Sequence, residues 1–175
     1  FGTALRPLGH ETRDLCPEPL RPVIDQALDA LYEPVNNGVY RAGFARSQAA
    51  YESAVEQLFT ALELWDGVLE HQRYLCGPMP TEADVCFFTT LIRFDAVYHG
   101  HFKCNRRRIV DYPNLWPYLR DLYQVPGVAE TVNFDHIRTH YYWSHESINP
   151  TRVVAVGPDL DLSAPHDRQA LIAKH

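Results

Sequence analysis

The residues ESAVEQLFTALELWDGVLE, at positions 52–70, carry apolar side chains at intervals of three and four. This spacing places Val55, Leu58, Leu62, Trp65 and Leu69 on one stripe of an α-helix, and the glutamates lie off the stripe. A long amphipathic helix of this kind has to bury its stripe against other elements, so the stretch predicts a helical core.

The segments on either side of this stretch carry the same periodicity. Before it, an apolar stripe runs from Leu20 to Val35 and ends at the loop signal Asn36-Asn37-Gly38. After it, Thr81 and Asp84 form a capping-box pattern, to which we assign a structural role. The helix that this pattern opens is apolar on most faces up to Phe94, which predicts a place in the centre of a bundle.

The remaining chain predicts two shorter helical elements, opening at Pro113 and Pro126, and a polar-aromatic segment around residues 134–143. No run alternates with period two for long enough to build a sheet, so the fold class is all-α. The predicted organisation is an incoming linker over residues 1–16, a helical domain over 17–146 and an extended C-terminal tail over 147–175.

Composition excludes several classes of protein. Of the 175 residues, 46% are hydrophobic and 22% charged, which is typical of a folded globular domain. The net charge of −6 argues against nonspecific binding to nucleic acid or a membrane surface, so neither partner is expected. No apolar run approaches the ~20 residues that a membrane-spanning helix needs.

The four cysteines, Cys16, Cys76, Cys86 and Cys104, are widely spaced and form no C-x-x-C pair. A domain of this size needs no disulfide framework, so a reducing, cytoplasmic compartment is the simpler interpretation. Cys86 falls within the apolar helical stretch, and we expect it to pack as a small hydrophobe.

A series of motifs follows in order along the chain: Asn36-Asn37-Gly38-Val39-Tyr40-Arg41-Ala42-Gly43-Phe44-Ala45, Thr81-Glu82-Ala83-Asp84, Thr89-Thr90-Leu91-Ile92-Arg93-Phe94-Asp95-Ala96-Val97-Tyr98, His101-Phe102-Lys103-Cys104-Asn105, Asp111-Tyr112-Pro113-Asn114-Leu115, Pro126-Gly127-Val128-Ala129-Glu130-Thr131-Val132, His140-Tyr141-Tyr142, Ser144-His145 and Ile148-Asn149-Pro150. In that order these motifs resemble those of the glutathionyl-hydroquinone reductases, the Xi class of glutathione transferases. The resemblance covers roughly residues 14–160, and it is to the C-terminal helical domain of the family.

The resemblance implies a two-domain enzyme that removes glutathione from glutathionyl-hydroquinones. Glutathione, the co-substrate, is bound mainly by a thioredoxin-like N-terminal domain, which also carries a nucleophilic cysteine. In the family the nucleophile lies in a C-P-x-x motif within a βαβ context, and no such stretch occurs in this sequence, so no catalytic residue is expected in this chain, and the chain alone is expected to be inactive. Because the sequence begins with Phe1 rather than Met, we expect a fragment or a processed product. The family also pairs mainly through its helical domains, which implies a homodimer.

Three tyrosines are the candidate substrate-binding residues. Tyr40, Tyr98 and Tyr141 each lie at or near the end of a predicted helix, inside a motif of the resemblance. A hydroquinone site needs an apolar slot with a few hydrogen-bonding groups, and tyrosine supplies both. We expect the three hydroxyls to converge on one open concavity.

Two alternatives remain open. His99, His101 and Cys104 form an H-x-H-x-x-C pattern, and His136 and His140 are spaced i, i+4. Both spacings are compatible with zinc ligands, although no metal is expected. The second alternative concerns function: the chain could be a non-catalytic transferase-like helical domain that acts only as a protein-interaction module.

Overall fold

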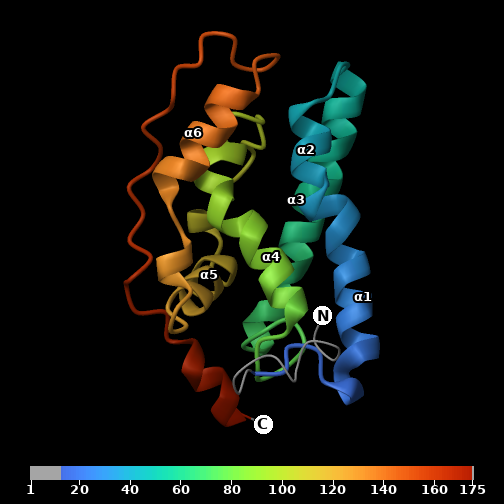
Figure 1. Cartoon of the computed structure of the whole chain (residues 1–175). Coiled ribbons are helices and arrows are strands. Elements are labelled where there is room, and N and C mark those ends of the chain that lie inside the picture. Colours follow the sequence, from blue (N-terminus) through green and yellow to red (C-terminus); the bar gives the residue numbers. More distant parts are fainter. Residues whose placement is uncertain (1–12, 175) are drawn as a thin grey trace, which may run out of the picture.

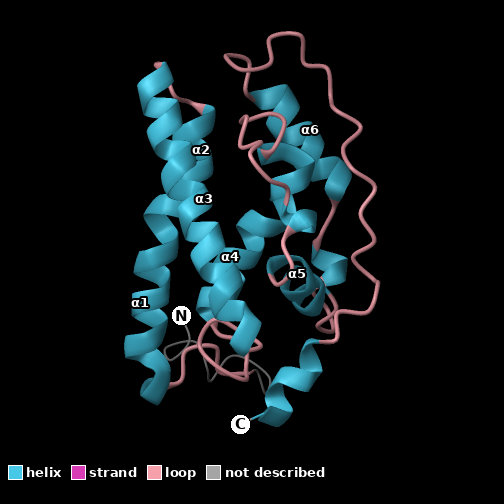
Figure 2. Ribbon diagram, turned by 180° about the vertical axis from the view of Figure 1, so that it is seen from behind, coloured by secondary structure: helices cyan, strands magenta, loops and turns pink. Residues whose placement is uncertain are grey.

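The computed structural model describes residues 13–174, and within them every regular element is a helix (Figures 1 and 2). Among these residues the sole β-type pairing is an isolated bridge between Tyr74 and Gly77. The chain therefore has the all-α class that its periodicity predicts. Of the predicted linker, residues 1–12 lie outside the described residues.

The first layer consists of α1 (Arg21–Leu31), α2 (Gly38–Gly43) and the long α3 (Gln48–His71), and within it α2 packs against α3. In Figure 1, α2 follows α1 along one side of the molecule, and α2 lies beside α3. The stripe predicted in α3 is its buried face: Leu58, Leu62 and Leu69 are fully buried. Such burial stabilises a helix by roughly 2 kcal/mol per large aliphatic side chain.

The prediction of a loop at Asn36-Asn37-Gly38 is wrong. A π-helical turn, η3 (Tyr32–Asn36), follows α1 directly, and α2 begins at Gly38. Pro34 lies within this turn; it lacks an N–H and cannot continue an ordinary α-helix, so the wider π turn accommodates it. The Asn36 side chain is engaged in packing, because its amide donates to the carbonyl of Cys86 and to the hydroxyl of Thr90, both at 2.8 Å.

Helix α4 (Glu82–Arg93) lies between the first layer and the helices α5 and α6, as both views show (Figures 1 and 2). It is less enclosed than its composition predicts. Val85 is 47% exposed and Cys86 is also exposed, so the expectation that Cys86 packs in the core is wrong. Burial is concentrated on the face that carries Ala83, Phe87 and Leu91, which the helical spacing of 100° per residue places close together.

Asp84 is the buried polar centre of this region, with no exposed surface. One carboxylate oxygen accepts the Thr81 N–H at 2.8 Å and the Thr81 hydroxyl at 3.0 Å, which closes the N-terminus of α4. The other accepts the Leu75 N–H at 2.9 Å and the Tyr118 hydroxyl at 2.7 Å. A single side chain thus joins α4, the preceding loop and α5.

The second layer begins where a π turn, η4 (Phe94–Tyr98), extends α4. Helix α5 (Leu115–Tyr123) starts two residues after Pro113, because Asp66 of α3 accepts the N–H groups of Asn114 and Leu115. Short 3-10 turns, η5 (Ile109–Asp111) and η6 (Ala129–Thr131), precede and follow it, and α6 (Phe134–Ser144) completes the layer.

The C-terminal tail is irregular after α6 and returns along the outside of the second layer to a final 3-10 segment, η7 (Arg168–Lys174) (Figure 1). Leu162 is buried on the way. Arg168, which is 4% exposed, donates to the carbonyl oxygens of Leu69, Gln72 and Arg73 at 2.9, 2.7 and 3.0 Å. The tail therefore caps the C-terminal end of α3, whose last carbonyls lack partners within the helix. No helix among the described residues is long and apolar enough to cross a membrane.

Candidate functional site

Three tyrosine hydroxyls meet where α2, η4 and α6 come together. Tyr40 is on α2, Tyr98 ends η4 and Tyr141 is on α6. The Tyr141 hydroxyl lies 2.6 Å from that of Tyr40 and 2.8 Å from that of Tyr98, while the Tyr40 and Tyr98 hydroxyls are 3.5 Å apart. The structure therefore brings together the three residues singled out from the sequence, with Tyr141 at the centre.

The hydroxyls line an open cavity of about 280 Å³. Besides the tyrosines, its walls are Asn36, Thr89, Thr90 and Arg93. A cavity with one aromatic side and several hydroxyl, amide and guanidinium groups suits a small aromatic ring that bears oxygen.

Burial sets the protonation of the two deeper tyrosines. It raises the pKa of Tyr141 to about 12, and the hydrogen bond to Tyr40 adds to this. Burial also raises the pKa of Tyr98, well above that of an exposed tyrosine. Both phenols therefore stay protonated at neutral pH and can donate hydrogen bonds or supply a proton, but they cannot act as bases.

Phe102 holds the tyrosines from behind, a role that the sequence analysis missed. Its fully buried ring lies 5.3 Å from Tyr40, 5.4 Å from Tyr98 and 5.9 Å from Tyr141, measured between ring centroids. The ring fits because residue 43 is glycine: a Cβ there would lie 2.3 Å from it. The one signal in the sequence is that Phe102 and Gly43 both fall within motifs of the family resemblance.

Two of the residues considered for zinc, His101 and Cys104, are buried. His101 Nε2 lies 3.2 Å from His145 Nδ1, and burial lowers the pKa of His101 to about 4. Cys104 is fully buried, and burial raises the pKa of its thiol to about 12. Over residues 13–174, no three His, Cys, Asp or Glu side chains are placed to hold a metal ion. The buried thiol also lacks the thiolate character of a nucleophile.

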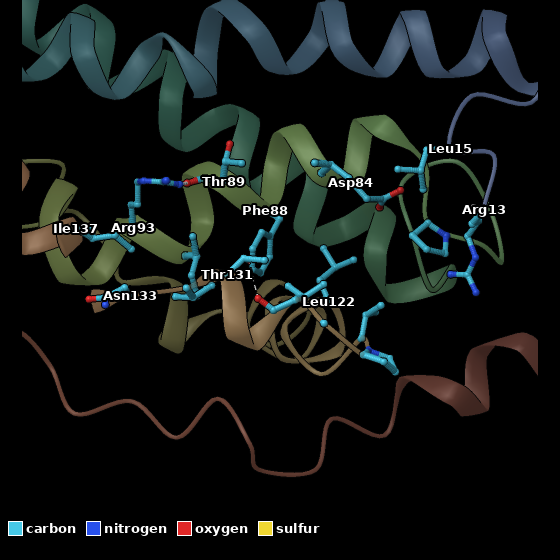
Figure 3. A pocket seen from close by; sticks show the side chains of 18 of the residues that line it. Arg13, Leu15, Asp84, Phe88, Thr89, Arg93, Leu122, Thr131, Asn133 and Ile137 are labelled. Carbon is cyan, nitrogen blue, oxygen red and sulfur yellow. Dashed lines mark hydrogen bonds between the residues drawn. The ribbon is translucent and has the colours of Figure 1, made fainter. Parts of the chain in front are cut away.

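A larger apolar groove adjoins the tyrosine cavity. Its volume is about 940 Å³, and it lies between α4 on one side and α5, η6 and α6 on the other (Figure 3). Its lining is mainly apolar and includes Val85, Phe88, Ile92, Leu122, Val132 and Ile137. Thr89 and Arg93 line both cavities, so the two are adjacent at the C-terminal half of α4.

Comparison with known proteins identifies what this arrangement is similar to. Residues 48–121 match the family model described as the C-terminal domain of glutathione S-transferase. The glutathionyl-hydroquinone reductase YqjG of Escherichia coli (strain K12) is 52% identical over 168 residues, which cover 96% of this chain and 51% of that protein.

Solved structures agree with the sequence match. The Xi class glutathione transferase of Natrialba magadii superposes with a TM-score of 0.94 at 56% identity, over 97% of this chain and 52% of that one. The glutathione-bound structure of Escherichia coli YqjG gives a TM-score of 0.93 at 52% identity, over 96% and 55% of the two chains. The chain thus spans about half the length of the curated relatives that it matches.

Proposed function

Since the chain belongs to the Xi class of glutathione transferases, we propose that it supplies the hydroquinone-binding part of a glutathione-dependent reductase. This is the class of the glutathionyl-hydroquinone reductases, and the chain corresponds to their C-terminal helical domain. The observation that carries this proposal is the meeting of the Tyr40, Tyr98 and Tyr141 hydroxyls within 2.6–3.5 Å of one another at an open cavity. Tyr98 and Tyr141 are buried, yet all three tyrosines line the cavity, and this arrangement supports a binding role.

In the proposed reaction, a thiolate of a thioredoxin-like N-terminal domain attacks the sulfur of a glutathionyl-hydroquinone. A sulfur–sulfur bond forms, the bond between sulfur and ring carbon breaks, and the ring carbon takes up a proton. The mixed disulfide is then resolved by a second glutathione. The part of this chain is to orient the ring and to donate hydrogen bonds from Tyr141 and Tyr98 to the ring oxygen on which charge develops.

The apolar groove is the surface that we assign to the partner domain. Val85 is 47% exposed and Phe88 half-buried, on the side of α4 that faces the groove. An apolar surface of this extent is typical of an interface rather than of a free surface. A domain seated there would reach the tyrosine cavity past Thr89 and Arg93, which border both.

We expect the 175-residue chain alone to show no glutathione-dependent release of hydroquinone from glutathionyl-hydroquinone. Joined in one polypeptide to the N-terminal half of the Escherichia coli relative, it should show turnover, measured chromatographically as hydroquinone released. Turnover by the chain alone that is lost in Cys104→Ala would contradict the proposal. Failure of the joined protein to turn over, although folded by circular dichroism, would favour an interaction module.

We further propose a homodimer with two-fold symmetry. Large apolar side chains are exposed on the first layer, at Val23, Tyr32 and Leu64, which supports a pairing surface there. Light scattering at micromolar concentration should give twice the mass of the chain, and a clean monomer would contradict the proposal. The four free thiols are compatible with a reducing, cytoplasmic compartment, which we propose for the enzyme.

A further inference from the structure

Arg93 lies in the last turn of α4, at the boundary between the tyrosine cavity and the apolar groove. Figure 3 shows its side chain extended along α4 toward Thr89, whose backbone carbonyl accepts a hydrogen bond from Nη1. This is the single hydrogen bond of the guanidinium within the described chain. A guanidinium has five N–H groups, so most of its donors remain available to a molecule in the cavity.

The charge of Arg93 is also not neutralised by the surrounding protein. Arg73, Arg106 and Arg138 each contact a carboxylate at 2.6–2.7 Å. Over residues 13–174, by contrast, no carboxylate lies within ion-pair distance of Arg93. A half-buried cation without a protein anion, at the wall of a small polar cavity, is placed to meet an anionic group of a ligand.

The positive charge of Arg93 acts on Tyr141, at the centre of the tyrosine cluster. Burial raises the pKa of Tyr141 to about 12, and the charge of Arg93 acts in the opposite direction on the same hydroxyl. The guanidinium and the Tyr141 hydroxyl thus share one electrostatic environment, and an oxygen bound beside Tyr141 would lie in the field of Arg93.

We propose that Arg93 determines specificity for aromatic ligands that carry an oxyanion, namely the ionised hydroxyl of the hydroquinone ring. This inference rests on the proposed function and assigns different roles to the tyrosines and to Arg93. The tyrosines, which stay protonated, donate hydrogen bonds, whereas Arg93 supplies the charge that favours the phenolate over the neutral phenol. Electron density that enters the ring when the carbon–sulfur bond breaks increases the charge on the ring oxygen, so the interaction strengthens in the transition state.

The test is a binding measurement with 4-nitrophenol, whose ionised form has its own visible absorbance, and with 4-nitroanisole, its neutral methyl ether. Equilibrium dialysis on the 175-residue chain gives both affinities, and a pH titration gives the pKa of the bound phenol. The variants are Arg93→Met, which removes the charge, and Arg93→Lys, which keeps the charge but lacks the planar set of guanidinium N–H donors. Arg41→Met is the matched control, because Arg41 is paired with Glu33 and lines neither cavity.

We expect the wild-type chain and Arg41→Met to bind the phenolate about tenfold more tightly than the ether, the size of one charge-assisted hydrogen bond. Arg93→Met should lose this preference while still binding the ether, and Arg93→Lys should retain part of it. Retained binding of the ether also shows that the variant is folded.

Two results would overturn the inference, and they differ in what they mean for the proposed function. Equal binding of phenolate and ether by the wild type, unchanged in Arg93→Met, would remove the role of Arg93 and leave the aromatic site intact. Binding of neither compound by the wild-type chain would remove the aromatic site itself, and the role of Arg93 with it.

Discussion

Tyr141→Phe should lower the turnover number of the two-domain enzyme about 100-fold, the usual loss when a donor to a developing oxyanion is removed. The Michaelis constant should change much less, because the lost hydrogen bond strengthens mainly in the transition state. Tyr141 is expected to matter most, since its hydroxyl contacts both other hydroxyls, at 2.6 and 2.8 Å. Tyr40→Phe should follow it, and Tyr98→Phe, the most buried of the three, should have the smallest effect.

The matched control is Tyr142→Phe, one residue along the same helix. Tyr142 packs against His101 and lines neither cavity, so its hydroxyl should be dispensable for turnover. Steady-state kinetics with a glutathionyl-hydroquinone separates the two constants for each variant. Equal turnover by Tyr141→Phe and wild type would refute a catalytic part for the cluster.

Asp84→Ala should destabilise the fold by about 4 kcal/mol, because it leaves several buried donors without an acceptor at once. The Leu75 N–H, the Thr81 N–H and the Tyr118 hydroxyl all donate to this carboxylate. Burial raises the pKa of Asp84, so the carboxylate is itself costly to bury and is retained because it satisfies these donors. Urea unfolding followed by circular dichroism measures the loss.

Glu82→Ala is the control for this change, since it removes a carboxylate from the same first turn of α4. Glu82 is half-buried and accepts no hydrogen bond from those three donors, so the expected cost is below ~1 kcal/mol. Tyr118→Phe, which removes a single donor, should cost about 1 kcal/mol. An unfolding free energy for Asp84→Ala within 1 kcal/mol of that of Glu82→Ala would contradict the assigned role.

Periodicity predicts the elements that bury a regular stripe. In α3, Val55, Leu58 and Leu62 recur at helical spacing, and each is buried. Periodicity fails where the backbone leaves the ordinary helix: Asn36-Asn37-Gly38 reads as a loop, but a π turn around Pro34 carries the helix through it. It also fails for Cys86, because the composition of α4 does not say which face a neighbouring layer covers.

The site was predictable only in part. Tyr40, Tyr98 and Tyr141 lie up to 101 residues apart, and no local pattern relates them, so their selection depended on the family motifs. Their hydroxyls meet because η4 shifts the direction of the chain after α4 and because Gly43 admits the ring of Phe102. Such close approaches depend on the tertiary arrangement, and no pattern in the sequence marks Phe102 or Arg93 as part of the site. The substrate-binding role of the tyrosines stays a prediction.

The anchoring of the tail has a consequence for the order in which the chain folds. The hydrogen bonds of Arg168 to Leu69, Gln72 and Arg73 span 95–99 residues of sequence. Contacts between distant residues carry the largest loop-closure entropy and form slowly, whereas the neighbouring helices α2 and α3 can pair locally and early. We therefore expect the first layer to form before the tail docks, with the end of α3 frayed in the interval. Docking of the tail would then be the late step that completes the cooperative unit, although no described residue of the tail lines the tyrosine cavity.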